Sequence, residues 1–252
     1  MRSIGLLYRA EIRRLMTPVN IALPFIFFGF TATIAIVVSK TGPQVSYLTF
    51  LNQVTLGFLL PFGIAALAGG MLAVDVKEYW TRTMLLRPVT REQYLVARIL
   101  AVFTGYLACV LVAGLFPPPV AALIADKPLV GSFWQITGFV ILSSMQGLLL
   151  IVLATMFSCW LPGIFNLVIL ALWAMSSQMV GGYLGRRYWD DGLMTSLKEF
   201  TFPSGFMDAA ADLGAGVLIP WSGIAWGCAA LAAFSGVTIW AFNRLNVEAS
   251  WE

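Results

Sequence analysis

The sequence lacks histidine altogether and has few charged residues, which make up 11% of the chain. Without histidine there is no Ser-His-Asp or Cys-His catalytic set, no His-ligated zinc and no histidine proton relay. A glycine-rich phosphate loop of the Walker type is also missing. The cysteines Cys109, Cys159 and Cys228 show no paired spacing, so we expect them to pack as small apolar residues. These absences exclude the enzyme classes that depend on such groups.

The few charges are unevenly placed, and five stretches contain none: Leu15–Ser39, Thr41–Val74, Ile99–Ala125, Pro128–Gly185 and Leu213–Asn243. A helix needs about 20 apolar residues to cross a bilayer. The pair Pro162-Gly163 divides the fourth stretch, because it ends one helix and allows a turn into the next. We therefore predict that residues 1–252 form one all-α integral membrane domain. Its six spans are 19–39, 47–74, 97–116, 133–158, 163–184 and 217–243.

The lysines and arginines set the orientation of these spans. With the N-terminus inside, ten of them fall in inner segments and five in outer ones. Cytoplasmic segments of membrane proteins carry the excess of Lys and Arg, so we predict that both chain ends are cytoplasmic. We expect the first span to stay in the protein instead of being cleaved as a signal peptide. The sequence shows no continuous basic face of the kind that binds nucleic acid. Tryptophans near the predicted interfaces indicate an aromatic belt: Trp134, Trp160, Trp189 and Trp221.

Residues 1–16 predict an amphipathic helix on the membrane surface. Its apolar side holds Ile4, Leu7, Tyr8, Ile12, Leu15 and Met16, and Arg2, Arg9 and Arg13 lie opposite, near lipid phosphates. Glu11 projects into the apolar side. It either reaches water from an edge or meets a cationic partner from another segment. We favour the second, because an unpaired acid is unfavourable there. Thr17-Pro18 then turns the chain into the first span.

The segment 75–98, between spans two and three, has more structure than a plain connector. Lys77–Leu86 predicts a short coupling helix, which Pro88 ends through its effect on the preceding residue. Thr90-Arg91-Glu92-Gln93 has the form of a capping box, so a second helix begins at Arg91 and continues into span three. These two helices, joined by a turn at Pro88, form a compact element that is able to dock on a cytoplasmic protein.

The segment 185–216 is the longest outer one, and we predict a re-entrant-like hairpin that partly enters the membrane before span six. Asp208 and Asp212 share a face if it is helical. No ionisable residue lies deep in a span, which argues against intramembrane enzymes and ion-coupled transporters. Neutral polar residues that could line a substrate path are Asn52, Gln53, Gln146, Asn166 and Gln178. For any one of these, and for Ser143 and Ser144, we favour interhelical hydrogen bonding.

One group of motifs resembles the signature of the ABC-2-type exporter permeases. It comprises Glu78, Leu85-Leu86-Arg87-Pro88-Val89, Thr90-Arg91 and Arg98. The six-span plan, the N-terminal helix with Glu11, Arg13 and Arg14, and the long segment before span six are similar to that family across nearly the whole chain. The resemblance implies a permease subunit in a bacterial cell membrane, which exports an amphipathic or hydrophobic substrate.

The same resemblance implies the partners. They are a second permease chain, identical or homologous, and two copies of a cytoplasmic ATP-binding cassette subunit. ATP and Mg²⁺ would belong to that subunit, so this chain would bind no cofactor and would not be an enzyme. Residues implied to contact the ATPase are Glu78, Arg82, Arg87, Pro88 and Arg91. Glu11, with Arg13 and Arg14, would tie the surface helix to the 75–98 segment.

Two other classes stay open. One is a membrane-embedded enzyme acting on lipid or peptide, which needs acids or histidines at a common depth, and the sequence has no such set. The other is the substrate-binding membrane subunit of an importer, in which so elaborate a 75–98 segment is unexpected. A catalytic product would identify the first, and the direction of transport would separate an importer from an exporter.

Overall fold

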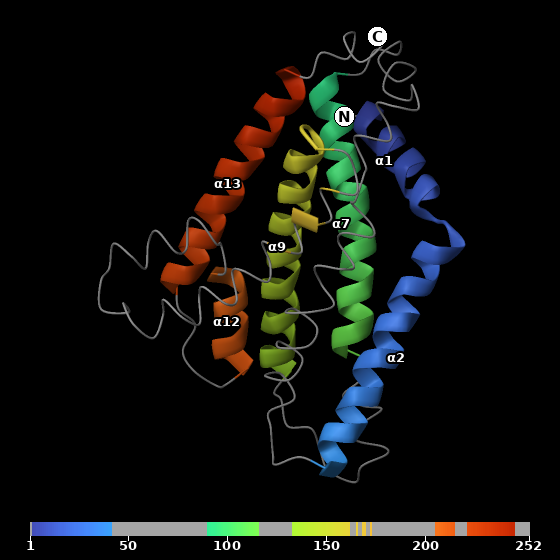
Figure 1. The fold of residues 1–252 in the computed structure, drawn as a ribbon, viewed down its shortest axis with the longest axis vertical. Coiled ribbons are helices and arrows are strands. Elements are labelled where there is room, and N and C mark those ends of the chain that lie inside the picture. Colours follow the sequence, from blue (N-terminus) through green and yellow to red (C-terminus); the bar gives the residue numbers. More distant parts are fainter. Residues whose placement is uncertain are drawn as a thin grey trace.

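The computed structural model describes residues 2–41, 90–115, 133–161, 165, 168–169, 172, 205–214 and 221–244. Six helices cover most of these residues (Figure 1): α1 Arg2–Leu15, α2 Pro18–Thr41, α7 Arg91–Leu115, α9 Phe133–Ser158, α12 Gly205–Gly214 and α13 Trp221–Arg244. The predicted span at 47–74 lies outside the described residues, as does most of the one at 163–184. The described part of the chain therefore bears out the all-α prediction.

Three of the described helices are long and apolar enough to cross a membrane: Arg91–Val112, Thr137–Ser158 and Gly223–Arg244. They fall on the predicted spans 97–116, 133–158 and 217–243, and α9 has the predicted bounds. Helix α2, at Pro18–Thr41, coincides with the first predicted span. The chain is a membrane protein with several candidate spans.

The long helices alternate in direction. Helices α2 and α7 run one way, and α9 and α13 run the other (Figure 1). This agrees with their predicted order as spans one, three, four and six. We call the end where α7 begins and α13 ends the basic end, because Arg91, Arg98 and Arg244 lie there, and we call the other the far end.

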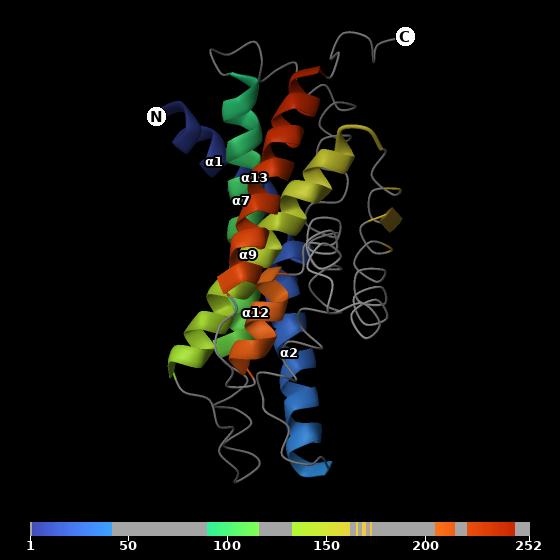
Figure 2. The same ribbon diagram turned by 90° about the vertical axis from the view of Figure 1, so that its left-hand side faces the viewer.

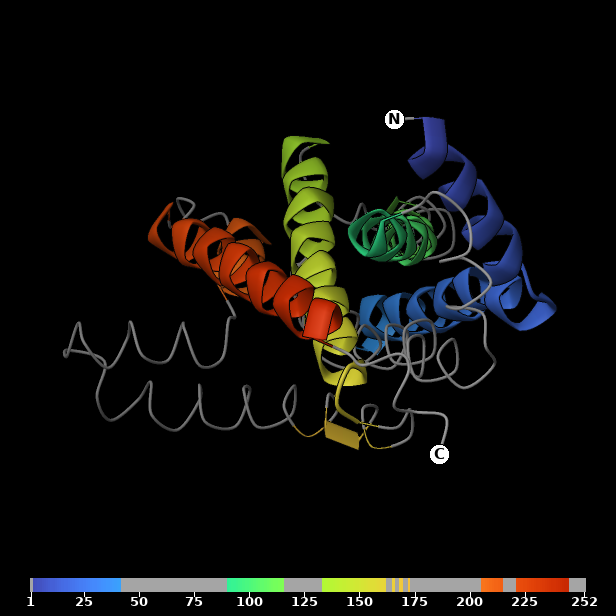
Figure 3. The ribbon, with the colours of Figure 1, turned by 90° about the horizontal axis from the view of Figure 1, so that it is seen from above.

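Helix α9 is the centre of the bundle. It lies between α7 on one side and α12 and α13 on the other (Figure 3). It is apolar on all sides, and most of its span is buried, although Ile141 and Met145 are exposed. Figure 2 shows it inclined across α7. The ring of Tyr106 occupies the space that a Cβ on Gly147 would need, and the Tyr106 hydroxyl donates to the carbonyl oxygen of Ser143 at 3.2 Å. Gly147 thus allows α7 and α9 to approach closely.

Helix α12 packs against both α9 and α13. Leu213 lies against Gly138 of α9, and Phe206 lies against Gly227 of α13. Both glycines belong to candidate spans, so α12 runs beside the apolar part of the bundle rather than outside it. This is the arrangement expected for the end of a segment that enters the membrane. Asp208 is exposed and Asp212 is half-buried, whereas residues 185–204 lie outside the described part of the chain.

The packing predicted for Cys228 is wrong, and Ser144 bonds within its own helix. The hydroxyl of Ser144 donates to the carbonyl of Val140 at 2.6 Å. A backbone carbonyl one turn earlier is always within reach of a helical serine. Cys228 is exposed instead of packed, because only one side of α13 contacts the bundle. By contrast, Thr238 does reach the carbonyl of Val152 in α9, at 3.4 Å.

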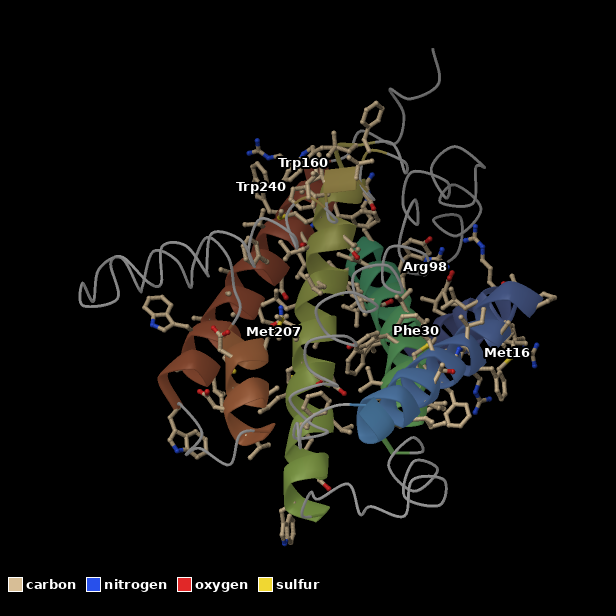
Figure 4. All side chains as sticks on the ribbon, turned by 60° about the horizontal axis from the view of Figure 1, so that its bottom comes forward. Met16, Phe30, Arg98, Trp160, Met207 and Trp240 are labelled. Atoms are coloured by element: carbon tan, nitrogen blue, oxygen red, sulfur yellow. The ribbon has the colours of Figure 1, made fainter. Side chains whose placement is uncertain are left out.

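Tryptophans mark both ends of the spans, as predicted. At the far end, Trp134 and Trp221 lie in the first turns of α9 and α13 and are 79% and 76% exposed. Trp160 follows the end of α9, and Figure 4 shows it near Trp240 at the basic end. Trp240 also lies under the guanidinium of Arg244, whose Cζ is 4.5 Å from the ring centroid. Trp189 lies outside the described residues.

Candidate functional site

The surface helix α1 is docked on protein. It packs along α7, with Leu7 and Glu11 buried in the contact. The apolar side predicted to rest in lipid is therefore largely covered by α7. Met16 departs from the prediction, since it is 64% exposed. The helix ends at Leu15, and the chain turns there into α2, which removes Met16 from the buried side.

Glu11 and Arg98 form a buried ion pair between α1 and α7. Glu11 Oε2 accepts from Arg98 Nη1, and the two side chains are 0% and 6% exposed. Figure 4 shows Arg98 on α7 beside α1. Burying either charge alone would be costly, and the pairing offsets that cost. The preferred interpretation of Glu11 required a cationic partner from another segment. The partner is Arg98, the last residue of the 75–98 segment.

A second polar contact holds α1 on α7. The Tyr8 and Thr104 hydroxyls are 2.8 Å apart, and Thr104 also donates to the carbonyl of Leu100 at 2.9 Å. Tyr8 and Glu11 are three residues apart and so lie on one side of α1. Two points of attachment fix both the position and the rotation of α1 on α7.

The start of α7 is a capping box, as predicted. The Gln93 amide donates to Thr90 Oγ1 at 3.2 Å, and the Thr90 amide donates to Gln93 Oε1 at 3.4 Å. Each side chain satisfies a backbone amide that the first turn leaves without an intrahelical partner. The prediction that a helix begins at Arg91 and runs on through Arg98 is confirmed.

The start of α7 also contacts the end of α13. Arg91 Nη1 donates to the carbonyl oxygen of Asn243 at 3.2 Å. The rings of Tyr94 and Phe242 are stacked, with centroids 6.3 Å apart. A cation at a helix C-terminus satisfies one of its last carbonyl groups and complements the helix dipole. These contacts attach α13 to the same part of α7 that holds α1.

Buried apolar residues join all of these elements. The basic-end cluster consists of Leu7, Tyr94, Leu95, Ala97, Cys159, Ala241 and Phe242. Its members come from α1, α7, α13 and the turn that follows α9. The basic end is therefore one packed unit, and the Glu11–Arg98 pair lies within it.

The remaining predicted site residues divide into two groups. Those outside the described residues are Glu78, Arg82, Arg87, Pro88, Asn52, Gln53, Asn166 and Gln178. Among the described ones, Gln146 is buried near the middle of α9, away from the basic end. Arg13 is exposed and Arg14 is half-buried. Glu11 is thus the member of the Glu11, Arg13 and Arg14 group that faces α7.

Sequence reasoning missed the contact between α7 and α13. Nothing in the sequence marks Asn243 or Phe242 as partners of Arg91 and Tyr94, since the two segments are about 150 residues apart. Tyr8 carried a signal, because a tyrosine on a buried side requires a partner for its hydroxyl. Over the described residues, no group of three or more Cys, Asp or Glu is placed to hold a metal ion. Comparison with known protein families finds no match, and comparison with curated proteins finds none either.

Proposed function

We propose that this chain is the membrane-spanning permease subunit of an ATP-binding cassette exporter of the ABC-2 type. The observation that carries the proposal is the buried Glu11–Arg98 pair. It joins the surface helix to the last residue of the segment whose motifs resemble that family. A plain connector between two spans would have no reason to bury an ion pair, which stabilises a fold less than apolar packing does.

The attachments of α7 suggest how motion would pass into the membrane. A force applied to the chain just before Thr90 would act directly on α7. It would reach α1 through Glu11–Arg98 and α13 through Arg91–Asn243. Packed helices move as rigid bodies and do not deform continuously. In this proposal, the three helices respond together when two ATP-binding subunits close beneath them.

The orientation in this proposal places the basic end in the cytoplasm, as the distribution of Lys and Arg favours. Glu78, Arg82 and Arg87 then contact the ATPase and fix its register by charge, with Pro88 setting the turn. ATP and Mg²⁺ belong to the ATPase. A second six-span permease chain pairs with this one. Gln146, with Asn52, Gln53, Asn166 and Gln178, lines the path of an amphipathic substrate.

The test uses the full chain, purified in mild detergent from its native membranes with whatever subunits remain bound. We expect a bound ATPase whose hydrolysis is coupled to transport in sealed inverted vesicles. Arg87→Glu and Glu78→Ala should insert normally but lose that coupling, because each removes a charge from the proposed contact. The measurement is ATP hydrolysed per substrate moved.

Matched controls come from the predicted outer segment. Arg186→Glu and Glu199→Ala make the same chemical changes on the other side of the membrane, and both should keep full coupling. Normal coupling in Arg87→Glu and Glu78→Ala would contradict the proposal. So would a loss of coupling in all four variants, because the effect would then not belong to the 75–98 segment.

A further inference from the structure

Arg91 belongs to the segment whose motifs imply an ATPase contact, but its side chain has a partner within the chain. It is the first residue of α7, and its Nη1 donates to the carbonyl oxygen of Asn243 in the last turn of α13, at 3.2 Å. Figure 1 shows the start of α7 and the end of α13 at the same end of the bundle. Arg91 is half-buried, whereas its neighbour Glu92 is exposed. The Arg91 guanidinium therefore lies on α13.

The carboxyl end of α13 suits a guanidinium for two reasons. The carbonyl of Asn243 is one of the last four of the helix, and these have no partner within a helix. The negative end of the helix dipole also favours a cation. Arg244 is in the same turn, but its guanidinium lies over the ring of Trp240, with Cζ 4.5 Å from the centroid. The cation on the Asn243 carbonyl thus comes from another helix.

Aromatic packing beside this hydrogen bond fixes its geometry. Tyr94 lies one turn after Arg91, on the same side of α7. Its ring stacks on that of Phe242, with centroids 6.3 Å apart, and both side chains are buried. One turn of α7 therefore holds the last turn of α13 by a directional hydrogen bond and a stack of rings.

Helix α13 depends on such attachments more than the other candidate spans do. It is the least buried of the three. Helices in lipid are held together by close packing and polar contacts, because the lipid tails are as apolar as the side chains. Thr238 contributes one such contact to α9, at 3.4 Å. Without Arg91, the end of α13 would keep α9 as its neighbour but lose this hydrogen bond to α7.

We infer that Arg91 is a positioning residue, which makes the end of α13 follow the start of α7, and that the ATPase is not its partner. The inference rests on the proposed function, in which the ATPase moves the start of α7. Arg87 keeps the role that the resemblance implies, as a contact for the ATPase. Arg91 passes the resulting motion on to α13.

The first measurement needs no ATPase. Spin labels at Val96→Cys on α7 and Val237→Cys on α13, both exposed positions, report the separation of the two helices by double electron–electron resonance. The sample is the full chain in a background without its three native cysteines. We expect a narrow distribution of distances, which Arg91→Gln should widen. Arg91→Lys should keep most of the narrow distribution, because it retains a cationic donor at the helix end.

The second measurement uses the purified complex with its ATPase. Arg91→Gln should leave the affinity of the ATPase for the permease unchanged. It should raise the ATP hydrolysed per substrate moved by about fivefold, the lower end of the usual coupling between two sites. Arg91→Lys should restore most of the coupling, which a loss of stability alone does not predict.

Arg87→Gln is the matched control, since it makes the same chemical change four residues earlier in the chain. It should leave the distribution of distances narrow but weaken ATPase binding by about tenfold, as expected for the loss of a charged contact.

Each measurement has a result that would overturn the inference. One is a loss of ATPase affinity in Arg91→Gln as large as in Arg87→Gln, because Arg91 would then be an ATPase contact. Others are an unchanged distribution of distances in Arg91→Gln, and normal coupling in that variant. Absence of a bound ATPase from the wild-type chain would instead contradict the proposed function itself, so the two failures are distinguishable.

Discussion

At the scale of single residues, the Glu11–Arg98 pair fixes how α1 lies on α7. A carboxylate on the apolar side of a surface helix is tolerated because a guanidinium from α7 meets it out of water. Charge-assisted pairing is also directional, so it fixes how α1 is rotated on α7. Apolar contacts such as that of Leu7 would permit sliding. The pair therefore determines position more than it adds stability.

This reasoning predicts how the pair responds to mutation. Glu11→Met leaves Arg98 buried without its counter-charge, and we expect a loss of about 3–5 kcal/mol in the free energy of unfolding. Glu11→Met/Arg98→Met removes both charges and should be clearly more stable than either single variant. Thermal unfolding of the full chain in detergent, followed by tryptophan fluorescence, measures the difference.

Glu92→Met serves as the control, because Glu92 is an exposed acid in the first turn of α7. It should change the unfolding midpoint little. If the double variant lost as much stability as the sum of the two single variants, the side chains would act independently and the pairing would have no energetic role.

The sequence shows that Glu11 requires a partner but does not identify it. Arg82, Arg87, Arg91 and Arg98 all belong to the 75–98 segment, and each carries the same charge. The choice depends on how α1 folds back along α7, which is a contact over 87 positions of sequence. Helical periodicity places a residue on a face, but it does not say which other helix covers that face.

At the scale of elements, the bounds of the long helices among the described residues were largely predictable. Charge-free stretches locate the spans, and the local signals at Thr17-Pro18 and Thr90–Gln93 give the starts of α2 and α7 within a residue. The packing of α12 against the bundle was harder to predict from the sequence. It depends on the glycines at 138, 223 and 227 lying opposite larger groups or backbone, and a glycine in a sequence does not reveal what it faces.

Gly227 offers a test of how α12 is held. A Cβ there would lie 2.8 Å from Cε2 of Phe206, and that ring is itself buried and unable to move aside freely. We expect Gly227→Ala to destabilise the full chain by about 1–3 kcal/mol through overpacking. The unfolding midpoint in detergent should fall accordingly.

The same helix supplies the comparison. Gly236 of α13 has no atom within 4 Å of where its Cβ would be, so Gly236→Ala should not lower the midpoint, and its higher helix propensity favours a small rise. Equal effects of the two substitutions would mean that the close approach of Phe206 to α13 does not limit the packing of α12.

At the scale of the whole molecule, the direction of each long described helix was predictable, but which helices pack side by side was not. Alternating spans follow from counting, and the basic residues choose which end is which. The meeting of α7 with the end of α13 has no counterpart in hydropathy, because helices in lipid associate through shape and a few polar contacts. The hydrogen bond from Arg91 to Asn243 is such a contact. Helix pairing inside a membrane is the level at which sequence reasoning stopped.

The arrangement of ends makes a prediction about both sides of the membrane. Single cysteines at Thr90 or Asn243, in a background without Cys109, Cys159 and Cys228, should react with an impermeant maleimide only from the cytoplasmic side. Cysteines at Trp134 or Trp221 should react only from the opposite side, because the bundle places these two at the far end. The arginines at 91, 98 and 244 cannot cross the apolar layer cheaply, so the orientation should be uniform. Labelling of Thr90→Cys and Trp221→Cys from the same side of sealed vesicles would contradict the alternation of α7 and α13.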